Sequence, residues 1–511
     1  MAQLLTAPEA AHWLRGRVTG TLRTDSRSVQ AGDGFLAWPG ARHDARTQVQ
    51  TALQQGAAAC LVEQQGADAF NFSDARIASF DAVKQMSGPI ADAYFDHPSN
   101  ALQVLAVTGT NGKTSSVWWL AQALSGLPGP ARRRCAMAGT LGVGFVPSPA
   151  GANAPAGLLS TGLTTPDAVM LQSSLCTLLQ AGAQACAIEA SSIGIEEHRL
   201  DATHIHTAVF TNLTQDHLDY HGSMEAYGRA KEKLFRWPGL RAAVVNIDDP
   251  FGARLARTLA ASALDLWTVS AHGSARLQAL AVRNSAEGLQ FVLQEGDQQQ
   301  ALRTALIGDY NVSNLLGVIA TLRSLGVPLA DAAAACSTVS AVPGRLERLV
   351  SPGAPMGVVD YAHTPDALDK VIEALRPLAR ERAGRLWCVF GCGGDRDPHK
   401  RPLMGAAAAA ADEIIVTSDN PRNEDPLAIM RQIATGLRQH ARVELEADRA
   451  RAIASAIGRA ASADVVLVAG KGHETVQEIR GTRYPFSDQT HVLSALARRA
   501  APPLHAGAAA C

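Results

Sequence analysis

Residues 105–114 read LAVTGTNGKT, and this segment is the most informative part of the sequence. Its apolar first half predicts a buried strand, and the residues after Lys113 predict a helix with Thr and Ser in its first turn. A strand, a glycine-punctuated turn, Lys-Thr and a helix form a phosphate cradle, because backbone N–H groups at the helix N-terminus face the anion. Lys113 supplies a positive charge there, and the Thr114 hydroxyl can hold Mg²⁺. We therefore expect ATP, or a close relative, to bind.

This cradle is a shortened variant of the P-loop. The consensus motif has a glycine where this chain has Val107, and the first glycine here is Gly109. A purely structural turn between a strand and a helix is the alternative. The spacing alone therefore predicts binding of nucleotide phosphates and no particular reaction.

Length and composition limit the class of protein. The 511 residues are enough for about three domains. Only 18% of the residues are charged and the net charge is −1, so no basic surface for nucleic acid or an anionic membrane is expected. No apolar stretch is long enough to span a membrane, and the N-terminus lacks the basic start of a signal peptide. We predict a cytoplasmic monomer that acts on small molecules and binds neither nucleic acid nor membrane.

Cysteine spacing predicts no metal site. Cys388 and Cys392 could form half of one, but no second pair accompanies them. We therefore predict buried free thiols for all eight cysteines, which are Cys60, Cys135, Cys176, Cys186, Cys336, Cys388, Cys392 and Cys511.

Turn-rich segments divide the chain into three predicted domains. A linker that includes Pro98 precedes the P-loop strand, and a second break falls at Pro343 and Gly344. The predicted domains are residues 1–98, 99–341 and 342–511.

One pattern recurs along the chain: a continuous apolar run ends in a polar or charged cluster. Such runs predict strands buried on both faces, and hence parallel sheets flanked by helices. Ligands bind beyond the carboxyl ends of the strands in these sheets. The predicted fold class is therefore α/β in three domains, with a central P-loop parallel-sheet ATPase domain and a Rossmann-like C-terminal domain. The predicted strands after the P-loop are 185–188, 207–210, 356–359, 386–390, 414–416 and 465–468.

Two of these strands lead to candidate Mg²⁺ ligands. Glu189 and His217 lie at or after strand ends and, with Thr114, could contact the cation. Hard cations that bridge ATP phosphates take few protein ligands and keep several waters. Either residue alone is more often a core or capping residue, but both together beside a P-loop favour a magnesium site.

The last third of the chain offers a pair of arginines. Arg422 follows the rigid turn at Pro421, and with Arg396 it makes two guanidinium forks suited to carboxylates. A loop salt bridge is the alternative. Residues 391–394 loosely resemble a dinucleotide fingerprint, but the glycine spacing fails, so NAD binding is not expected.

Several motifs, in order, resemble those of the Mur ligases, the ATP-dependent enzymes that add amino acids during peptidoglycan synthesis. They are GTNGKT at 109–114, EASS at 189–192, DHLD at 216–219, NVSN at 311–314, PGRLE at 343–347 and DYAHTP at 360–365. DNPR at 419–422 and GKGHE at 470–474 resemble the branch of the family that adds meso-diaminopimelate. The likeness runs from residue 25 to beyond residue 474, nearly the whole chain.

The resemblance implies a reaction. ATP phosphorylates the D-glutamyl γ-carboxylate of UDP-N-acetylmuramoyl-L-alanyl-D-glutamate, and an amine of meso-diaminopimelate attacks the acyl phosphate to release phosphate. Because two anions must approach each other, the task of the protein is charge neutralisation and positioning. ATP and Mg²⁺ are the implied cofactors.

The resemblance also implies roles for individual residues. Lys113, Glu189, His217 and Lys231 would be catalytic. Thr114, Glu189, His217 and a carbamoylated Lys231 would hold Mg²⁺, although an ordinary exposed helix lysine is the alternative for Lys231. ATP would be bound by Gly109, Thr110, Asn111, Gly112, Lys113, Thr114, Ser115, Asn311, Asn314, Arg345, Asp360 and His363. The UDP-linked substrate would be bound by Thr24, Ser26, His43, Asp44, Ala45, Thr164, Thr165, Ser191, Glu197 and Arg199. meso-Diaminopimelate would be bound by Arg396, Asp419, Asn420, Pro421, Arg422, Gly470 and Glu474.

The chain departs from the family pattern at two positions. Glu197 stands where many relatives carry glutamine, and Ile193 stands where they often have histidine. A carboxylate at position 197 would repel the phosphates of the substrate unless it is paired.

A sister ligase that adds L-lysine and a non-catalytic nucleotide-binding homologue are the alternative functions. The motif at Arg422 argues against the first, and the intact Lys113 and Lys231 argue against the second.

Overall fold

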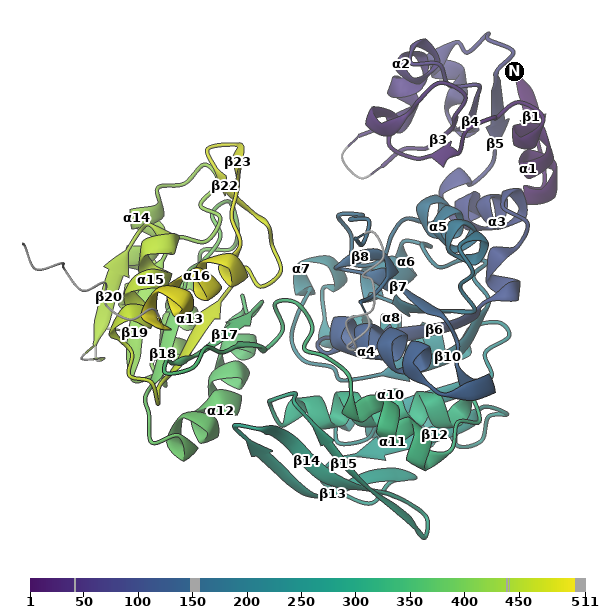
Figure 1. Cartoon of the computed structure of the whole chain (residues 1–511). Helices are drawn as coiled ribbons and strands as arrows, with labels where there is room; N and C mark the ends of the chain where they lie inside the picture. Colours follow the sequence, from purple (N-terminus) through teal and green to yellow (C-terminus); the bar gives the residue numbers. More distant parts are fainter. Residues whose placement is uncertain (41–42, 148–156, 438–439, 441, 501–511) are drawn as a thin grey trace, which may run out of the picture. The chain divides into compact units, whose positions relative to one another are not determined.

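The computed structural model describes residues 1–40, 43–147, 157–437, 440 and 442–500 of the chain. The chain forms two compact units (Figure 1). One comprises Met1–Leu280, Leu293–Gln300 and Ser313–Val339, and the other comprises Ala281–Val292, Ala301–Val312 and Ser340–Cys511. Each unit is described by itself.

The N-terminal part of the first unit contains a five-stranded sheet in the order β1-β5-β4-β3-β2. All neighbouring strands pair in parallel, and the middle strands are buried along their length. Leu14, Leu36 and Leu61 belong to one core cluster of this sheet and its helices. The strands are β1 Ala2–Leu4, β2 Leu22–Arg23, β3 Gly34–Ala37, β4 Ala59–Glu63 and β5 Ile77–Phe80, and the helices are α1 Ala7–Arg15, α2 Val49–Gln54 and α3 Val83–Tyr94.

The largest sheet has ten strands in the order β15-β14-β13-β12-β11-β10-β6-β9-β7-β8. Strand β6 lies between β10 and β9, and it pairs with both in parallel. The P-loop therefore emerges at the middle of the parallel part of the sheet, where strand ends on both sides can reach it. The strands are β6 Gln103–Thr108, β7 Cys135–Gly139, β8 Gly142–Phe145, β9 Ala185–Glu189, β10 Ile205–Phe210, β11 Ala242–Asn246, β12 Asp265–Ser270, β13 Leu277–Ser285, β14 Gly288–Glu295 and β15 Gln298–Thr304.

Helix α4, Lys113–Gly126, follows the P-loop and is buried from Thr114 to Leu124. Its apolar residues show no single face, as expected for a helix that is covered on all sides. Packing therefore fixes the position of its N-terminus. The other helices of this region are α5 Ala168–Gln180, α6 Ser192–Glu196, α7 Leu218–His221, α8 Met224–Glu232, α9 Pro250–Leu259, α10 Tyr310–Ser324 and α11 Leu329–Ser337.

The second unit contains a six-stranded sheet in the order β16-β17-β21-β18-β19-β20. Every pair is parallel except β16 with β17. A separate two-stranded hairpin is formed by β22 and β23. The strands are β16 Glu347–Leu349, β17 Met356–Asp360, β18 Leu386–Phe390, β19 Glu413–Thr417, β20 Val443–Glu446, β21 Val465–Ala469, β22 Val476–Ile479 and β23 Thr482–Pro485.

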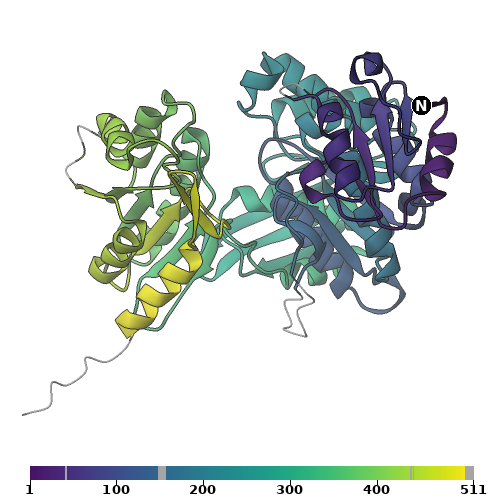
Figure 2. The same ribbon diagram turned by 90° about the horizontal axis from the view of Figure 1, so that it is seen from above.

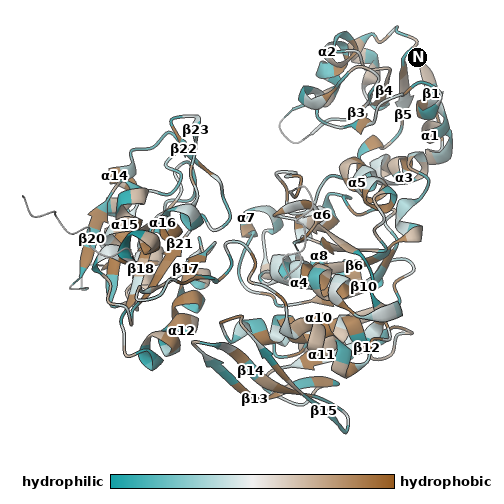
Figure 3. Cartoon of the chain, in the orientation of Figure 1, coloured by the Kyte–Doolittle hydropathy of each residue, from teal (hydrophilic) through white to brown (hydrophobic). Residues whose placement is uncertain are grey.

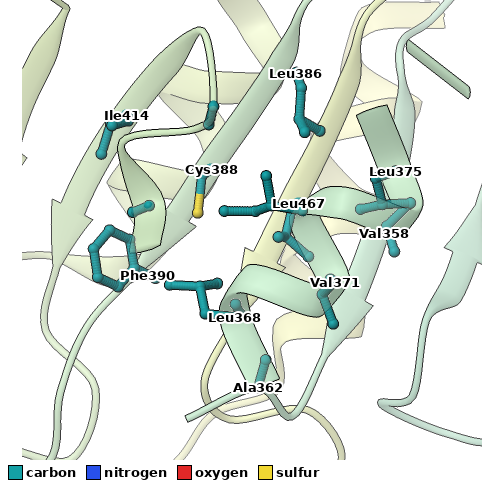
Figure 4. Packing of buried hydrophobic residues seen from close by; sticks show 14 of the residues in the cluster. Val358, Ala362, Leu368, Val371, Leu375, Leu386, Cys388, Phe390, Ile414 and Leu467 are labelled. Carbon is teal, nitrogen blue, oxygen red and sulfur yellow. The ribbon is translucent and has the colours of Figure 1, made fainter. Parts of the chain in front are cut away.

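Helices cover both faces of this six-stranded sheet. On one face, Leu368 and Leu375 of α12 lie in a core cluster with Cys388 and Phe390 of β18 (Figure 4). On the other face, Val492 of α16, which is yellow in Figure 2, belongs to a cluster with residues of α15 and β21. The helices are α12 Pro365–Glu381, α13 Lys400–Ala408, α14 Pro426–Ala434, α15 Arg449–Arg459 and α16 Asp488–Ala500.

The strands predicted from apolar runs are confirmed as β9, β10, β17, β18, β19 and β21, all in parallel pairs. Figure 3 shows hydrophobic residues, in brown, concentrated on the strands of the sheets. Among the cysteines in the described part of the chain, all are free thiols, and Cys176 alone is half-buried where full burial was predicted. Cys511 lies outside the described residues. Within the described residues, no helix is long and apolar enough to cross a membrane.

Candidate active site

The P-loop has the backbone geometry that a phosphate cradle requires. Strand β6 ends at Thr108, and α4 begins at Lys113. Gly112 is the N-terminal cap of α4 with a φ of +86°, a conformation that favours glycine. A Cβ atom at Gly112 would also collide with the side-chain oxygen of Asn314. Asn314, predicted to bind ATP, therefore lies against the loop. Ser115 is buried in the first turn of α4.

Residues after β10 hold the P-loop in place. The backbone N–H of Thr110 donates to the carbonyl of Asn212 at 2.8 Å, and that of Asn111 donates to the Asn212 Oδ1 at 2.9 Å. The Thr211 hydroxyl donates to the carbonyl of Asn111 at 2.6 Å. The loop is thus braced by the neighbouring strand end, as the parallel arrangement predicts.

Two lysines approach the same backbone carbonyl. Lys113 Nζ donates to the carbonyl oxygens of Gly109 and Thr110, each at 2.8 Å, and Lys231 Nζ donates to the same Gly109 oxygen at 2.8 Å. Lys231 is only 1% exposed, so the alternative of an exposed helix lysine is wrong. Burial, together with the charge of Lys113, holds the pKa of Lys231 well below its usual value. Burial and the positive charge of Lys113 therefore both favour the neutral amine form of Lys231.

Tyr227 connects these groups and was not predicted as a site residue. Its hydroxyl lies 3.1 Å from the Thr110 Oγ1, and the Lys231 Nζ lies 4.2 Å from the centre of its ring. The ring centres of His217 and Tyr227 are 6.1 Å apart in an edge-to-face arrangement. Tyr227 is fully buried. Its place in helix α8, one turn before Lys231, was the only signal in the sequence.

Glu189 is the last residue of β9, and its carboxylate is buried. It accepts hydrogen bonds from the backbone N–H of Thr140 at 2.8 Å and from the Thr140 hydroxyl at 3.3 Å. Thr114 is buried in the first turn of α4. His217 is half-exposed before α7, with a φ of +52°. No group of three or more His, Cys, Asp and Glu side chains that could hold a metal occurs among the described residues.

The predicted contacts for the UDP-linked substrate in the central region form one cluster beside Glu189. The Thr165 hydroxyl donates to the Glu189 carbonyl at 2.7 Å and lies 2.9 Å from the Ser191 hydroxyl. Arg199 Nη1 donates to the Thr165 carbonyl at 3.0 Å. Thr164 accepts a hydrogen bond from the Thr140 hydroxyl at 3.2 Å. The structure therefore brings these residues together next to a candidate metal ligand.

Glu197, which departs from the family pattern, is paired. Its Oε2 lies 2.5 Å from the Lys84 Nζ, and its Oε1 accepts a hydrogen bond from the Tyr220 hydroxyl at 2.6 Å. Although partial burial favours the protonated form, these two partners hold the pKa of Glu197 below its ordinary value. From the sequence, we expect a carboxylate here to repel the substrate phosphates unless it is paired, and Glu197 is paired. Ile193 lies in helix α6.

The N-terminal candidates occupy two loops. Thr24 donates a side-chain hydrogen bond to Asp167, which precedes α5, and Ser26 lies in a 3-10 turn capped by Asp25. His43 is exposed, and Asp44 caps the next 3-10 turn, which starts at Ala45. Residues 41–42, beside His43, lie outside the described residues. None of these hydrogen bonds joins one loop to the other.

The second unit holds the remaining predicted ATP residues. The Asp360 carboxylate accepts hydrogen bonds from the backbone N–H groups of Leu346 at 2.7 Å and Ala362 at 2.8 Å. Burial raises the pKa of Asp360, although Arg345 opposes the shift. The Arg345 guanidinium stacks 4.5 Å from the centre of the Tyr361 ring, and the ring of His363 lies 4.7 Å from that ring. Asn311, in α10, donates to the Ile307 carbonyl at 2.8 Å.

The predicted diaminopimelate residues gather at the ends of β19 and β21. Asn420 Nδ2 donates to the Glu474 Oε2 at 2.8 Å. Gly470 has a φ of +117°, and a Cβ atom there would collide with the Asp419 carboxylate. Arg422, which follows Pro421 at the end of the loop, donates from Nη1 to the Gly394 carbonyl at 2.7 Å.

The side chains of both predicted arginines lie near one glycine. A Cβ atom at Gly393 would be 3.0 Å from Arg422 Nη1 and 3.7 Å from Arg396 Cγ. Arg422 Nε also lies 3.6 Å from the Glu478 carboxylate, and its backbone N–H donates to the Glu478 carbonyl at 3.1 Å. The hairpin of β22 and β23 therefore supports Arg422. Sequence reasoning missed this support because no motif links β22 with the loop.

A buried ion pair contacts the backbone at the ends of β19 and β21. Arg449 donates to both oxygens of Asp488 at 2.7 Å, and both side chains are 0% exposed. Arg449 Nη2 also donates to the carbonyl of Ala469, the last residue of β21, at 2.9 Å. No sequence motif predicts this pair, because the partners are on different helices.

The chain matches two Mur ligase models. Residues 107–322 match the Mur ligase middle domain, and residues 344–472 match the Mur ligase glutamate ligase domain. A relative from Acidovorax sp. (strain JS42), named UDP-N-acetylmuramoyl-L-alanyl-D-glutamate--2,6-diaminopimelate ligase, is 57% identical over 97% of this chain and 98% of its own length. A relative of the same name from Janthinobacterium sp. (strain Marseille) is 46% identical over 94% of each chain.

Solved structures resemble the chain over almost its whole length. A structure of a protein of that name superposes with a TM-score of 0.64 at 35% identity, covering 94% of this chain and 95% of its own. The MurF ligase from Thermotoga maritima in complex with ADP gives a TM-score of 0.64 at 19% identity, covering 95% and 98%, and this likeness shows the fold alone. The predicted fold class, α/β in three domains, is confirmed, while the boundaries at residues 98 and 341 stay predictions. The chain has a P-loop held by a neighbouring strand end, and relatives match it over almost its whole length. It therefore belongs to the Mur ligase family.

Proposed function

We propose that the chain is the ATP-dependent ligase that adds meso-diaminopimelate to the D-glutamyl γ-carboxylate of UDP-N-acetylmuramoyl-L-alanyl-D-glutamate, a step of peptidoglycan precursor synthesis. The observation that carries this proposal is the 57% identity over 97% of the chain to a relative of that name. The partners are then small molecules. We further propose that the enzyme is a cytoplasmic monomer.

The P-loop residues would neutralise the phosphates of ATP. The N-terminus of α4 presents backbone N–H groups, and Lys113 adds a positive charge beside them. Transfer of the γ-phosphoryl group of ATP to the γ-carboxylate would form an acyl phosphate and release ADP. Attack by the neutral amine on the acyl carbon would then form the amide as the amine loses a proton and phosphate leaves. Positioning and charge neutralisation are the contribution of the protein.

The residues beside the loop fit a magnesium ion held by few protein ligands. Thr114 and Glu189 offer the oxygen atoms that Mg²⁺ prefers, and the described residues form no closed cage of acidic and histidine ligands. When bound, Mg²⁺ supplies charge neutralisation at the phosphates. We propose that Thr114, Glu189, His217 and a carbamate on Lys231 hold it.

The environment of Lys231 supports carbamoylation. A neutral amine is needed to attack CO₂, and burial lowers the pKa of Lys231 toward that form. The nitrogen bonds to the CO₂ carbon and releases a proton, so a carbamate anion replaces the neutral amine. That anion would lie beside the Lys113 ammonium, whose positive charge stabilises it.

The experiment combines purified protein with ATP, Mg²⁺, the UDP-linked dipeptide and meso-diaminopimelate. We expect ADP, phosphate and a UDP-linked tripeptide in equal amounts, measured by coupled assay and mass spectrometry. Parallel reactions contain L-lysine or no amino acid. A tripeptide formed equally well with L-lysine would favour the sister ligase, and no turnover with any amino acid would favour the non-catalytic homologue.

A further inference from the structure

A buried lysine lies beneath the predicted amino-acid site, and no role has been assigned to it. The side chain of Lys471, in the loop after β21, is 0% exposed. Its Nζ lies 2.7 Å from the Glu474 Oε2 and donates to the Asn420 Oδ1 at 3.0 Å. A buried cation is costly unless it is paired and hydrogen-bonded, and both partners here are predicted to contact the substrate.

Lys471 fixes which way the Asn420 amide points. The Asn420 Oδ1 accepts hydrogen bonds from Lys471 Nζ and from the Glu478 backbone N–H, the latter at 3.0 Å. A flipped amide would place its NH₂ group against these two donors, so the observed orientation is the only one that satisfies them. The Asn420 NH₂ group is therefore directed at Glu474.

Lys471 also fixes the Glu474 carboxylate. Lys471 and Asn420 both donate to Oε2, at 2.7 and 2.8 Å. The Glu474 side chain is 29% exposed, so the carboxylate lies between the buried lysine and the open side of the site. Two donors on one oxygen orient the carboxylate with the other oxygen, Oε1, away from Lys471.

We propose that Lys471 is a positioning residue for the amino-acid substrate: its buried ammonium orients Asn420 and Glu474 so that Glu474 Oε1 accepts a hydrogen bond from an ammonium group of meso-diaminopimelate. This inference rests on the proposed function. Lys471 itself does not touch the substrate. It acts on the second half-reaction, the attack of the amine, and not on the formation of the acyl phosphate.

The test compares Lys471→Met, which keeps the length of the side chain but removes the charge, with Lys370→Met. Lys370 is the matched control, because it pairs with Asp366 at 2.8 Å on the exposed surface of α12 in the same unit. We expect Lys471→Met to raise the KM for meso-diaminopimelate roughly 10- to 100-fold, the effect of losing hydrogen bonds to a charged group. The KM for ATP and for the UDP-linked substrate should change less than about threefold, within the scatter of such single-contact effects. Lys370→Met should leave all three KM values unchanged.

A second measurement separates positioning from a general structural role. Hydroxylamine replaces the amino acid and captures the acyl phosphate as a hydroxamate, with release of phosphate. We expect the rate of hydroxamate formation to be the same in Lys471→Met and in the unmodified enzyme. Equal loss of hydroxamate and tripeptide formation would overturn the inference.

The double variant Lys471→Met/Glu474→Gln keeps the test decisive if the single variant does not fold, because it removes both charges together. We expect its KM for meso-diaminopimelate to match that of Glu474→Gln alone, since Lys471, directly and by way of Asn420, acts on the substrate through the Glu474 carboxylate. A tenfold higher KM in the double variant would refute the inference. Failure of the unmodified enzyme to use meso-diaminopimelate would instead refute the proposed function.

Discussion

Replacing Arg422 should remove most of the preference of the enzyme for meso-diaminopimelate over L-lysine. The two amino acids differ by one carboxylate, and the Arg422 guanidinium is the fork proposed to receive it. Its side chain is 22% exposed, so a missing carboxylate would leave the cation only partly solvated. Each hydrogen bond to a charged group contributes about 1.5–3 kcal/mol, so a two-bond fork contributes about 3–6 kcal/mol, or about 10²–10⁴-fold in kcat/KM.

The assay measures kcat/KM for both amino acids with the unmodified enzyme, Arg422→Lys and Arg422→Ala. We expect the unmodified enzyme to prefer meso-diaminopimelate by about 10²–10⁴-fold and Arg422→Ala to lose most of that ratio by raising the KM for meso-diaminopimelate. Arg422→Lys keeps the charge but not the planar fork, so it should also lose most of the preference. The KM for ATP serves as the internal control, because Arg422 also supports the Gly394 backbone. Comparable kcat/KM values for the two amino acids in the unmodified enzyme would refute the reasoning.

Four further predictions concern other parts of the protein. Lys113→Ala should abolish amide formation without lowering the Tm, because its charge acts on phosphates; near-normal turnover would contradict the phosphate cradle. Lys231→Ala should be nearly inactive and partly rescued by short carboxylates. Because burial lowers the pKa of Lys231, more of the amine is neutral than for an exposed lysine, and reactivation of decarbamoylated enzyme by bicarbonate should slow as the pH falls. An unmodified Lys231 peptide mass from active enzyme would exclude carbamoylation. Glu197→Gln should keep the KM for the UDP-linked substrate, whereas Lys84→Ala should raise it because the carboxylate loses its cationic partner and keeps only the Tyr220 hydroxyl; the reverse order would contradict the pairing argument. Arg449→Met should lower the free energy of unfolding by about 3–5 kcal/mol in denaturant titrations, since it leaves a buried charge without its partner, and a loss below about 1 kcal/mol would contradict that reasoning.

The sequence predicted the strands that lead to the site, because each of them is a continuous apolar run that ends in polar residues; other buried parallel strands, such as β4 and β11, were not predicted. Strand β18, Leu386–Phe390, has the predicted bounds, and β21 is one residue longer at its end. The P-loop was predictable for the same reason, since strand, turn and helix are adjacent in the chain. Strands β13 to β15 were not predicted, because their alternating, partly exposed residues lack such a run.

The supporting contacts of the site could not be predicted, because they join residues far apart in the sequence. Lys84 of α3 pairs with Glu197, which directly follows α6. Lys471 lies in a loop rich in glycine and charge, where the sequence does not indicate burial. Burial decides the chemistry of Lys231 as well, and a lysine within a polar helix reads the same whether it faces solvent or the core. Motifs identify the groups that meet a ligand, whereas the groups that orient them depend on the fold.

The pairing of the loop at residues 419–422 with β22 has a consequence for engineering. The Arg422 backbone bonds to Glu478 and Arg480, and the Gln477 side chain donates to the Asp419 carbonyl at 2.6 Å. The loop and the hairpin form one structural unit, although they come from two separate segments of the sequence. In a chimaera that carries only the loop of another enzyme, the foreign loop would pack against a hairpin whose backbone fits the original loop. Transplants of amino-acid preference between such enzymes should therefore exchange residues 419–422 together with residues 476–485.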